Sequence, residues 1–268
     1  MQGVIAPVAQ GSFKERLQSG QPLIGTFISE VRNPLIAGML AEAGMDFLIV
    51  DMEHAAYNYE TAAAICAVGR EAGIGCLVRI PEIRRETVLK PLDMGAAGLL
   101  VPQVESVDQV RALVQHAKYP PQGKRGAALR RAHNRYGQVA DAAGYLAAAN
   151  EQTVLVIQVE SPQAVEALED MLALRAVDGV FVGPFDLSVA MGIPGQLTHP
   201  ALQEQVEKVI AACQRHGVIC GIHQSNIEGA KFWLERGIRL LAYSGDGAMI
   251  VDAAAAAVRA LVPKKGEQ

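Results

Sequence analysis

Aromatic residues are scarce in this sequence: Phe, Tyr and Trp together make up 5% of its 268 residues, and there is one Trp. This scarcity excludes a core built on aromatic rings. The hydrophobic half of the chain consists mainly of Ala, Val, Leu and Ile. A chain of this length can bury one large core, and its length does not demand a second domain. We therefore predict a single α/β domain spanning residues 1–268.

Cysteine is also rare, and the four cysteines are Cys66, Cys76, Cys213 and Cys220. None forms a CxxC pair, and none stands beside a histidine at zinc-finger spacing, so the sequence gives no sign of a structural zinc site. We interpret the four thiols as small buried hydrophobic groups in a reducing compartment. The expected location is the cytoplasm.

Long hydrophobic runs are absent from the sequence. No segment reaches the roughly 20 continuous apolar residues of a membrane helix. The start, MQGVIAPVAQGSFKERL, lacks the charged and then apolar pattern of a signal peptide. The net charge of −4 gives no overall attraction to nucleic acid or to an acidic membrane. We expect a small-molecule partner, and neither nucleic acid nor a membrane.

Short apolar runs recur along the chain, and most follow a glycine that is typical of a helix end. The eight runs are 22–29, 47–52, 75–81, 98–104, 153–160, 179–187, 217–223 and 237–246. The segments between them are mostly Ala-, Glu- and Leu-rich with helical periodicity. Strands that alternate with helices pair in parallel through right-handed crossovers. Eight such units predict a (β/α)8 TIM barrel, and a doubly wound open sheet is the alternative.

Two carboxylates stand where predicted strands end, Glu160 after VLVIQV and Asp186 after GVFVGPF. In a barrel, strand ends carry the chemistry. Two carboxylates in one cavity repel each other unless a cation lies between them, and Mg²⁺ or Mn²⁺ prefers such oxygen ligands. Gln158, two residues before Glu160, points to the same side and can hold a substrate oxygen. The alternative for each carboxylate is a helix cap or a salt bridge, which is the stronger alternative for Asp186.

A second polar group follows the strand at 47–52 and contains Asp51, Glu53 and His54. A histidine can move protons near neutral pH, and a neighbouring carboxylate raises its basicity. Asp51 and His54 are three residues apart at a bend and are the candidate acid/base pair, while Glu53 faces the metal through water or orients the loop. The alternative is a surface loop with local hydrogen bonds.

Arg79 interrupts an otherwise apolar strand, and burying an unpaired arginine is costly. We expect its guanidinium to face the barrel mouth, where it can stabilise an enolate oxygen. It can equally be a structural partner of Glu160 or Asp51. No lysine lies in a predicted strand, which disfavours a Schiff-base aldolase.

Other features allow more than one interpretation. The stretch 118–137 is rich in Lys and Arg, and is either a solvated loop or a basic lip over an anionic substrate. Gly183 and other glycines near strand ends have backbone amides that can bind a phosphate or a carboxylate. His223 ends the seventh predicted strand and is a weak candidate for the site.

Five motifs, in this order, resemble those of the HpcH/HpaI family of class II pyruvate aldolases. They are DMEHAAYN, LVRIP, PPQGKRGA, IQVESP and FVGPFDLSVAMG, and the resemblance runs from about residue 25 to about residue 247. It implies that Glu160 and Asp186 bind a divalent metal, Mg²⁺, Mn²⁺ or Co²⁺, which pyruvate chelates. It also implies that Arg79 holds the keto oxygen and that Asp51 and His54 form the acid/base dyad.

The same resemblance assigns substrate-binding roles to Gln158, beside the pyruvate, and to Gly183 and Pro184, where backbone amides seat the carboxylate. Phe27 stands where the family often has a tryptophan that shapes the aldehyde pocket. Phe185 stands where the family commonly has a small or polar residue. Because of these two differences from the family pattern, the resemblance does not identify the aldehyde substrate. Such enzymes are typically homo-oligomers, hexamers with exchanged C-terminal helices, which suits the Ala-rich segment near the end of this chain.

These observations lead to one hypothesis for the reaction, with two alternatives. We expect metal-dependent, reversible aldol cleavage of a 4-hydroxy-2-oxo acid into pyruvate and an aldehyde. The first alternative is a lyase of CoA esters from the same superfamily, although the sequence has no signal for an adenine and pantetheine groove. The second is a catalytically silent barrel that binds oxo-acids.

Overall fold

Eight parallel strands form a closed barrel. The computed structural model describes residues 11–262, and its strands pair in chain order from β1 to β8, with β8 returning to β1. They are β1 Leu23–Ile28, β2 Phe47–Asp51, β3 Gly75–Arg79, β4 Gly98–Val101, β5 Val154–Val159, β6 Gly179–Val182, β7 Ile219–Gln224 and β8 Leu240–Gly245. Seven strands lie within the predicted apolar runs, and β7 extends one residue beyond its run, to Gln224. The predicted TIM barrel is therefore confirmed, and the open sheet is excluded.

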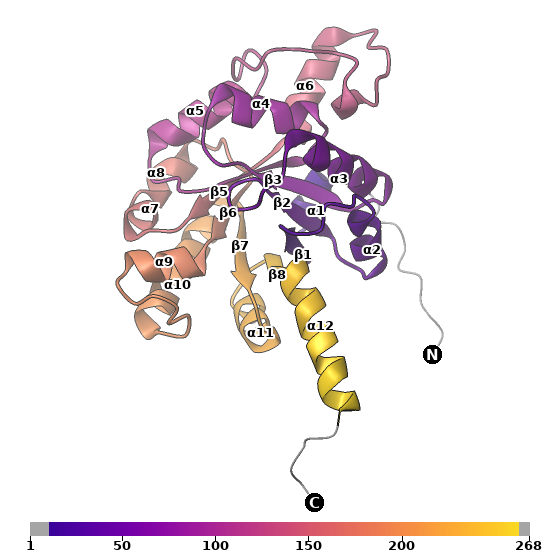
Figure 1. The fold of residues 1–268 in the computed structure, drawn as a ribbon. Helices are drawn as coiled ribbons and strands as arrows, with labels where there is room; N and C mark the ends of the chain where they lie inside the picture. The colour runs from indigo at the N-terminus through magenta and orange to yellow at the C-terminus, as the bar shows by residue number, and fades with distance from the viewer. Residues whose placement is uncertain (1–10, 263–268) are drawn as a thin grey trace, which may run out of the picture.

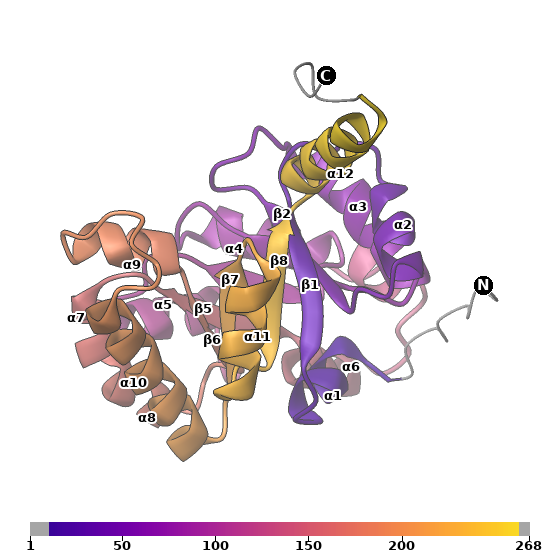
Figure 2. The same cartoon turned by 90° about the horizontal axis from the view of Figure 1, so that it is seen from below.

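Helices alternate with the strands and surround the barrel (Figures 1 and 2). They are α1 Phe13–Gln18, α2 Ile36–Glu42, α3 Tyr59–Glu71, α4 Arg85–Asp93, α5 Val107–Ala117, the 3-10 turn η1 Ala132–Asn134, α6 Ala142–Gln152, α7 Pro162–Glu166, α8 Leu168–Ala173, α9 Pro184–Ala190, α10 Pro200–His216, α11 Ile227–Glu235 and α12 Asp246–Leu261. Asn58, Ser106 and Asn226 begin α3, α5 and α11 because their side chains accept backbone N–H groups of the first turn.

The core has two layers because alternate residues of each strand face opposite sides of the barrel wall. One layer lies between strands and helices, and the other fills the barrel interior with residues such as Phe47, Leu100 and Phe181. The short helix α1 closes the amino-terminal end of the barrel, where the ring of Phe13 lies 6.2 Å from that of Phe47. Gly75 permits this approach, since a Cβ there would come within 2.3 Å of the Phe13 ring.

The basic stretch at 118–137 lies at the amino-terminal end of the barrel, because it connects α5 to α6 and so precedes β5. Lys118 is buried and donates to the carbonyl oxygens of Asn150 and Thr153, and burial lowers its pKa to about 8. Arg125 is buried and donates to Asp93 at 2.6 Å. The interpretation as a basic lip over the active site of the same chain is therefore wrong, since the lip would have to lie at the opposite end.

The last helix, α12, extends away from the barrel (Figure 1). Its exposed apolar side chains are Ile250, Val251, Val258 and Leu261. Between residues 11 and 262, no helix combines the length and the apolarity needed to cross a membrane. Residues 1–10 and 263–268, part of the predicted domain, lie outside the described residues, and so does most of the start that was compared with a signal peptide.

Candidate active site

Polar side chains from several strands meet at the carboxyl-terminal mouth of the barrel, around a cavity of about 330 Å³. Parallel strands bring their ends to one rim, which is why residues far apart in sequence gather here. Seven residues proposed from the sequence line this cavity, namely Phe27, Asp51, Arg79, Gln158, Gly183, Pro184 and Asp186. Glu160 lies directly behind Gln158 and Gly183, and His54 lies outside the lining.

The Arg79 guanidinium contacts two carboxylates, Asp51 at the end of β2 and Glu53 in the loop that follows β2. Arg79 is 9% exposed, and its Nε and Nη2 donate to the two oxygens of Asp51 at 2.9 and 2.7 Å. Its Nη1 lies 3.3 Å from Oε2 of Glu53. The guanidinium also lies over the Phe27 ring, 4.8 Å from the ring centroid. Paired with two carboxylates, this buried arginine stays charged at the cavity wall.

The structure does not form the expected contact between Asp51 and the His54 ring. Asp51 accepts the backbone N–H groups of Glu53 and His54 at 3.0 and 3.3 Å, in addition to Arg79. The His54 side chain is 66% exposed, and its Nε2 lies 3.7 Å from Oε2 of Glu53. The expected pairing is corrected, because a bidentate arginine and two amides occupy the Asp51 oxygens. Asp51 shapes the turn, and Glu53 is the carboxylate nearest to the imidazole.

Glu160 is buried in a site that disfavours its charge. Desolvation raises its pKa to about 7, an amide hydrogen bond from Gln103 opposes this rise, and the nearby charges of Asp186 and Glu53 add to it. Gln158 Nε2 donates to one Glu160 oxygen, and the Gln103 N–H donates to the other at 3.0 Å. Because the charge of Asp186 raises the pKa of Glu160, the two proposed metal ligands lie near enough to repel each other.

Gly183 has no side chain to obstruct the acidic pair. A Cβ at this position would come within 2.5 Å of Oε1 of Glu160 and within 2.9 Å of Nε2 of Gln158. The Gly183 N–H donates to the carbonyl of Val159, and a proline follows it. These two residues therefore contribute backbone shape to the cavity, because neither has an N–H group left to offer to a carboxylate.

A divalent metal fits the oxygen donors at this end of the barrel. Two carboxylates repel each other there, and Gln158 Oε1 and Glu53 Oε2 are buried without hydrogen-bond partners in the described part of the chain. Over residues 11–262, no group of three or more His, Cys, Asp or Glu side chains is placed to hold a metal ion. Two carboxylates suffice for a hard cation whose remaining ligands are water and substrate oxygens. Glu160 and Asp186 would be the two carboxylate ligands of this cation.

Two residues at or near the mouth of the barrel, His223 in the cavity lining and Asp246 outside it, carried little or no signal in the sequence. His223, from β7, packs edge-to-face on Phe27 at 5.5 Å, and its Nε2 lies 3.1 Å from the Ser244 carbonyl. Asp246, at the start of α12, accepts the amides of Ser29 and Val31 at 3.0 and 2.7 Å and so anchors the β1–α2 loop. The sequence signal for His223 and Asp246 is that each apolar run, 217–223 and 237–246, changes to polar residues at its end.

Comparison with known proteins agrees with this architecture. The HpcH/HpaI aldolase/citrate lyase family matches residues 24–253. The chain is 36% identical over 250 residues to the hydroxypyruvate/pyruvate aldolase of Roseovarius nubinhibens, covering 92% of this chain and 95% of that protein. It is 35% identical over 249 residues to the 4-hydroxy-2-oxo-heptane-1,7-dioate aldolase of Escherichia coli, covering 92% of this chain and 93% of the relative.

A solved structure is also similar to this chain over nearly its whole length. The crystal structure of an HpcH/HpaI aldolase from Desulfitobacterium hafniense DCB-2 superposes with a TM-score of 0.90 at 37% identity, covering 96% of this chain and 99% of the other. The family match at residues 24–253 includes the strand residues that line the cavity. The chain belongs to the HpcH/HpaI aldolase/citrate lyase family.

Proposed function

We propose that this protein catalyses the reversible aldol cleavage of a 4-hydroxy-2-oxo acid into pyruvate and an aldehyde, with a divalent cation (Mg²⁺, Mn²⁺ or Co²⁺) held by Glu160 and Asp186. The observation that carries this proposal is the buried Arg79 guanidinium, which lines the same cavity as Asp186, while the Glu160 carboxylate that Asp186 repels lies directly behind the cavity wall. No lysine lines this cavity in the described part of the chain, which agrees with a metal-dependent rather than a Schiff-base route.

When bound, the cation would act as a Lewis acid that stabilises negative charge on substrate oxygens. Cleavage of the C3–C4 bond leaves its electron pair on the pyruvate part, as an enolate. Arg79 is held rigidly by Asp51 and Glu53, so its charge needs no reorganisation when the enolate oxygen develops. Gln158 can donate to a substrate oxygen at the cavity wall.

The reaction also requires removal of the C4 hydroxyl proton. His54 is the proposed base, since its imidazole is on the rim and has Glu53 as its nearest carboxylate. Asp51 acts as a positioning residue, because it accepts the amides of the turn that presents His54 and orients Arg79. This division of roles replaces the Asp51–His54 dyad expected from the sequence.

Deuterium exchange at the methyl group of pyruvate tests the proposed activity. In D₂O with Mg²⁺ or Mn²⁺, an aldolase exchanges these protons through the enolate, whereas a barrel that only binds oxo-acids does not. We expect exchange that a chelator abolishes and added metal restores, measured by proton NMR. Chelator-resistant exchange, or a covalent adduct trapped by borohydride with pyruvate, would contradict the proposal.

We infer further that the aldehyde is a hydroxyaldehyde, and His223 supports this inference. The Ser244 carbonyl can only accept, so His223 Nε2 carries the proton. Burial lowers the pKa of His223, the hydrogen bond to the Ser244 carbonyl opposes this effect, and the charge of Arg79 adds to it, so the net shift favours the neutral imidazole. Nδ1 of the neutral imidazole is then an acceptor, on a side chain that lines the cavity. Ser29 and Ser225 place further hydroxyl groups in the same lining. A hydroxyl on the aldehyde matches this acceptor, and a methyl group does not.

Replacing His223 with Phe is expected to lower the preference for glycolaldehyde over propionaldehyde about fivefold to tenfold, the effect of one neutral hydrogen bond. The two aldehydes differ by a hydroxyl in place of a methyl, so the ratio of their kcat/KM values cancels general damage. His116→Phe on α5, outside the cavity lining, is the matched control. An unchanged ratio in His223→Phe would remove this residue from acceptor selection.

We also propose a homo-oligomer, a hexamer in which α12 packs on a neighbouring subunit. The exposed apolar side chains of α12 support this assembly, because a helix that extends from the barrel has no cover for them within the described chain. The mass in solution, measured by light scattering, tests it.

A further inference from the structure

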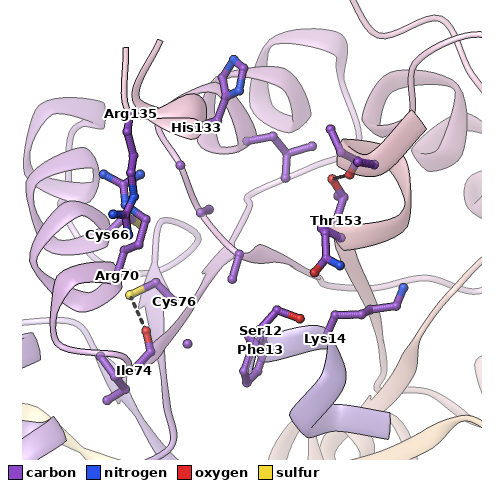
Figure 3. A pocket seen from close by; sticks show the side chains of 18 of the residues that line it. Ser12, Phe13, Lys14, Cys66, Arg70, Ile74, Cys76, His133, Arg135 and Thr153 are labelled. Atoms are coloured by element: carbon purple, nitrogen blue, oxygen red, sulfur yellow. Dashed lines mark hydrogen bonds between the residues drawn. The ribbon is translucent and has the colours of Figure 1, made fainter. Parts of the chain in front are cut away.

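A larger cavity, of about 630 Å³, lies at the amino-terminal end of the barrel, opposite the candidate active site (Figure 3). Its floor includes Gly75 and Thr153, which stand at the starts of β3 and β5. Phe13 and Lys14 of α1 form one wall. Arg70, at the end of α3, lies on another beside Arg135 from the 118–137 stretch. None of these groups takes part in the proposed aldol reaction.

Buried polar atoms without a hydrogen-bond partner lie at both ends of the barrel. In residues 11–262, seven buried side-chain nitrogen or oxygen atoms have no hydrogen-bond partner, and two of them, on Glu53 and Gln158, belong to the candidate active site. The other five are on residues that line the amino-terminal cavity: Arg16 Nε and Nη1, Arg70 Nε, Arg125 Nε and the Tyr119 hydroxyl. All five can donate a hydrogen bond, and the four arginine atoms can only donate.

The charges around this cavity are also unbalanced. Its lining includes five cationic side chains: Lys14, Arg16, Arg70, Arg125 and Arg135. Four carboxylates lie near them, on Asp178, Asp46, Glu71 and Asp93. Arg70 and Arg135 share Glu71, whose Oε1 lies 3.6 and 3.4 Å from their nitrogens and whose side chain is 64% exposed. Among residues 11–262, one of these positive charges is therefore left without a carboxylate of its own.

The deepest part of the lining is built from Arg125 and Tyr119, which are 6% and 1% exposed. The guanidinium lies over the Tyr119 ring, 4.6 Å from the ring centroid, and Nη2 is fixed by Asp93. The Tyr145 hydroxyl bonds to Nδ1 of His133 on the same lining. Asp93 and the Tyr119 ring hold Arg125 in place, while its Nε and the Tyr119 hydroxyl have no hydrogen-bond acceptor within residues 11–262.

We propose that this amino-terminal cavity binds a small organic oxyanion, a phosphate monoester or a carboxylate, through Arg70, Arg125 and Tyr119. An oxyanion has several lone pairs and a negative charge, and so can satisfy several donors at once. A water molecule also needs acceptors for its own protons, and most of the unpartnered atoms here cannot accept. Phe13, Ile74 and Leu92 add apolar surface, which suits a ligand with a hydrocarbon or aromatic part.

Calorimetric titration of the metal-free, full-length protein tests this site without reference to aldolase activity. The probes are inorganic phosphate, phenyl phosphate and benzoate, at constant ionic strength. We expect saturable 1:1 binding of phenyl phosphate, tighter than that of inorganic phosphate because of the apolar wall. Benzoate binding as tightly as phenyl phosphate would assign a carboxylate ligand to the same site, and weaker benzoate binding would assign a phosphate.

Two variants locate the bound probe. Arg70→Gln removes one charge, and Tyr119→Phe removes only the unpartnered hydroxyl while leaving the ring under Arg125. Each is expected to weaken phenyl phosphate binding about tenfold. Tyr59→Phe, at the other end of α3, is the matched control and should bind as the wild type does. The proposal is overturned if no probe binds saturably up to roughly 10 mM, or if both variants bind as tightly as the wild type.

Discussion

Replacing Arg79 with Met is expected to slow metal-dependent proton exchange in pyruvate by about 10²–10³-fold, the usual effect of removing one preorganised group that stabilises an oxyanion. Arg79 is buried, fixed by both oxygens of Asp51 and close to Glu53, so no other cation on the cavity wall can replace it. Lysine at this position keeps the charge but loses the two-pronged contact, so Arg79→Lys should retain only part of the exchange activity.

The same substitution is expected to destabilise the protein by about 3–5 kcal/mol, because it leaves the buried Asp51 carboxylate, and Glu53 beside it, without compensation. Urea denaturation of the metal-free protein measures this change. Arg84→Met is the matched control, since Arg84 is largely exposed and pairs only with a surface glutamate. Near-normal exchange in a folded Arg79→Met variant would remove Arg79 from the enolate role.

Replacing Glu160 with Gln is expected to reduce exchange by about 10³-fold at saturating pyruvate and moderate metal concentration. Removal of one of two charged oxygen ligands weakens the cation site, and with it the stabilisation of the enolate. Excess Mn²⁺ should restore part of the activity. Glu166→Gln, an exposed position six residues later, is the matched control. Wild-type activity in Glu160→Gln protein at the same metal concentration, with the same metal requirement as the wild type, would exclude Glu160 as a ligand.

Glu160→Gln should also change how the stability of the metal-free protein depends on pH. The folded pKa of Glu160, about 7, lies above its ordinary value of 4.5, so between these values the folded state binds more protons than the unfolded state. Stability contributed by this group is present below pH 4.5 and is lost as pH rises through about 7. The variant should therefore be more stable than the wild type at pH 8 and similar to it at pH 5. Parallel stability profiles for the two proteins would contradict this expectation.

Much of the site followed from the order of strands and polar residues. Glu160, Asp186 and Arg79 were predicted at the barrel mouth because a parallel strand that alternates with helices has a fixed direction. Seven of the proposed residues line one cavity for this reason. The choice of partners within the site stayed open, because the sequence offered both Asp51 and Glu160 as partners of Arg79. Asp51 pairs with Arg79 rather than with His54 because β2 and β3 are neighbours and place the two residues opposite each other in register.

The sequence by itself determined the barrel, the end at which its acidic residues gather and the family, because hydrophobic periodicity and motif order are properties of the chain. Only the tertiary structure decided that the basic stretch at 118–137 turns to the opposite end, that His223 meets Phe27, and that five unpartnered donors of the described chain belong to residues lining the amino-terminal cavity. The reason is physical: these contacts join residues far apart in the chain, so their geometry depends on how whole strands and helices pack.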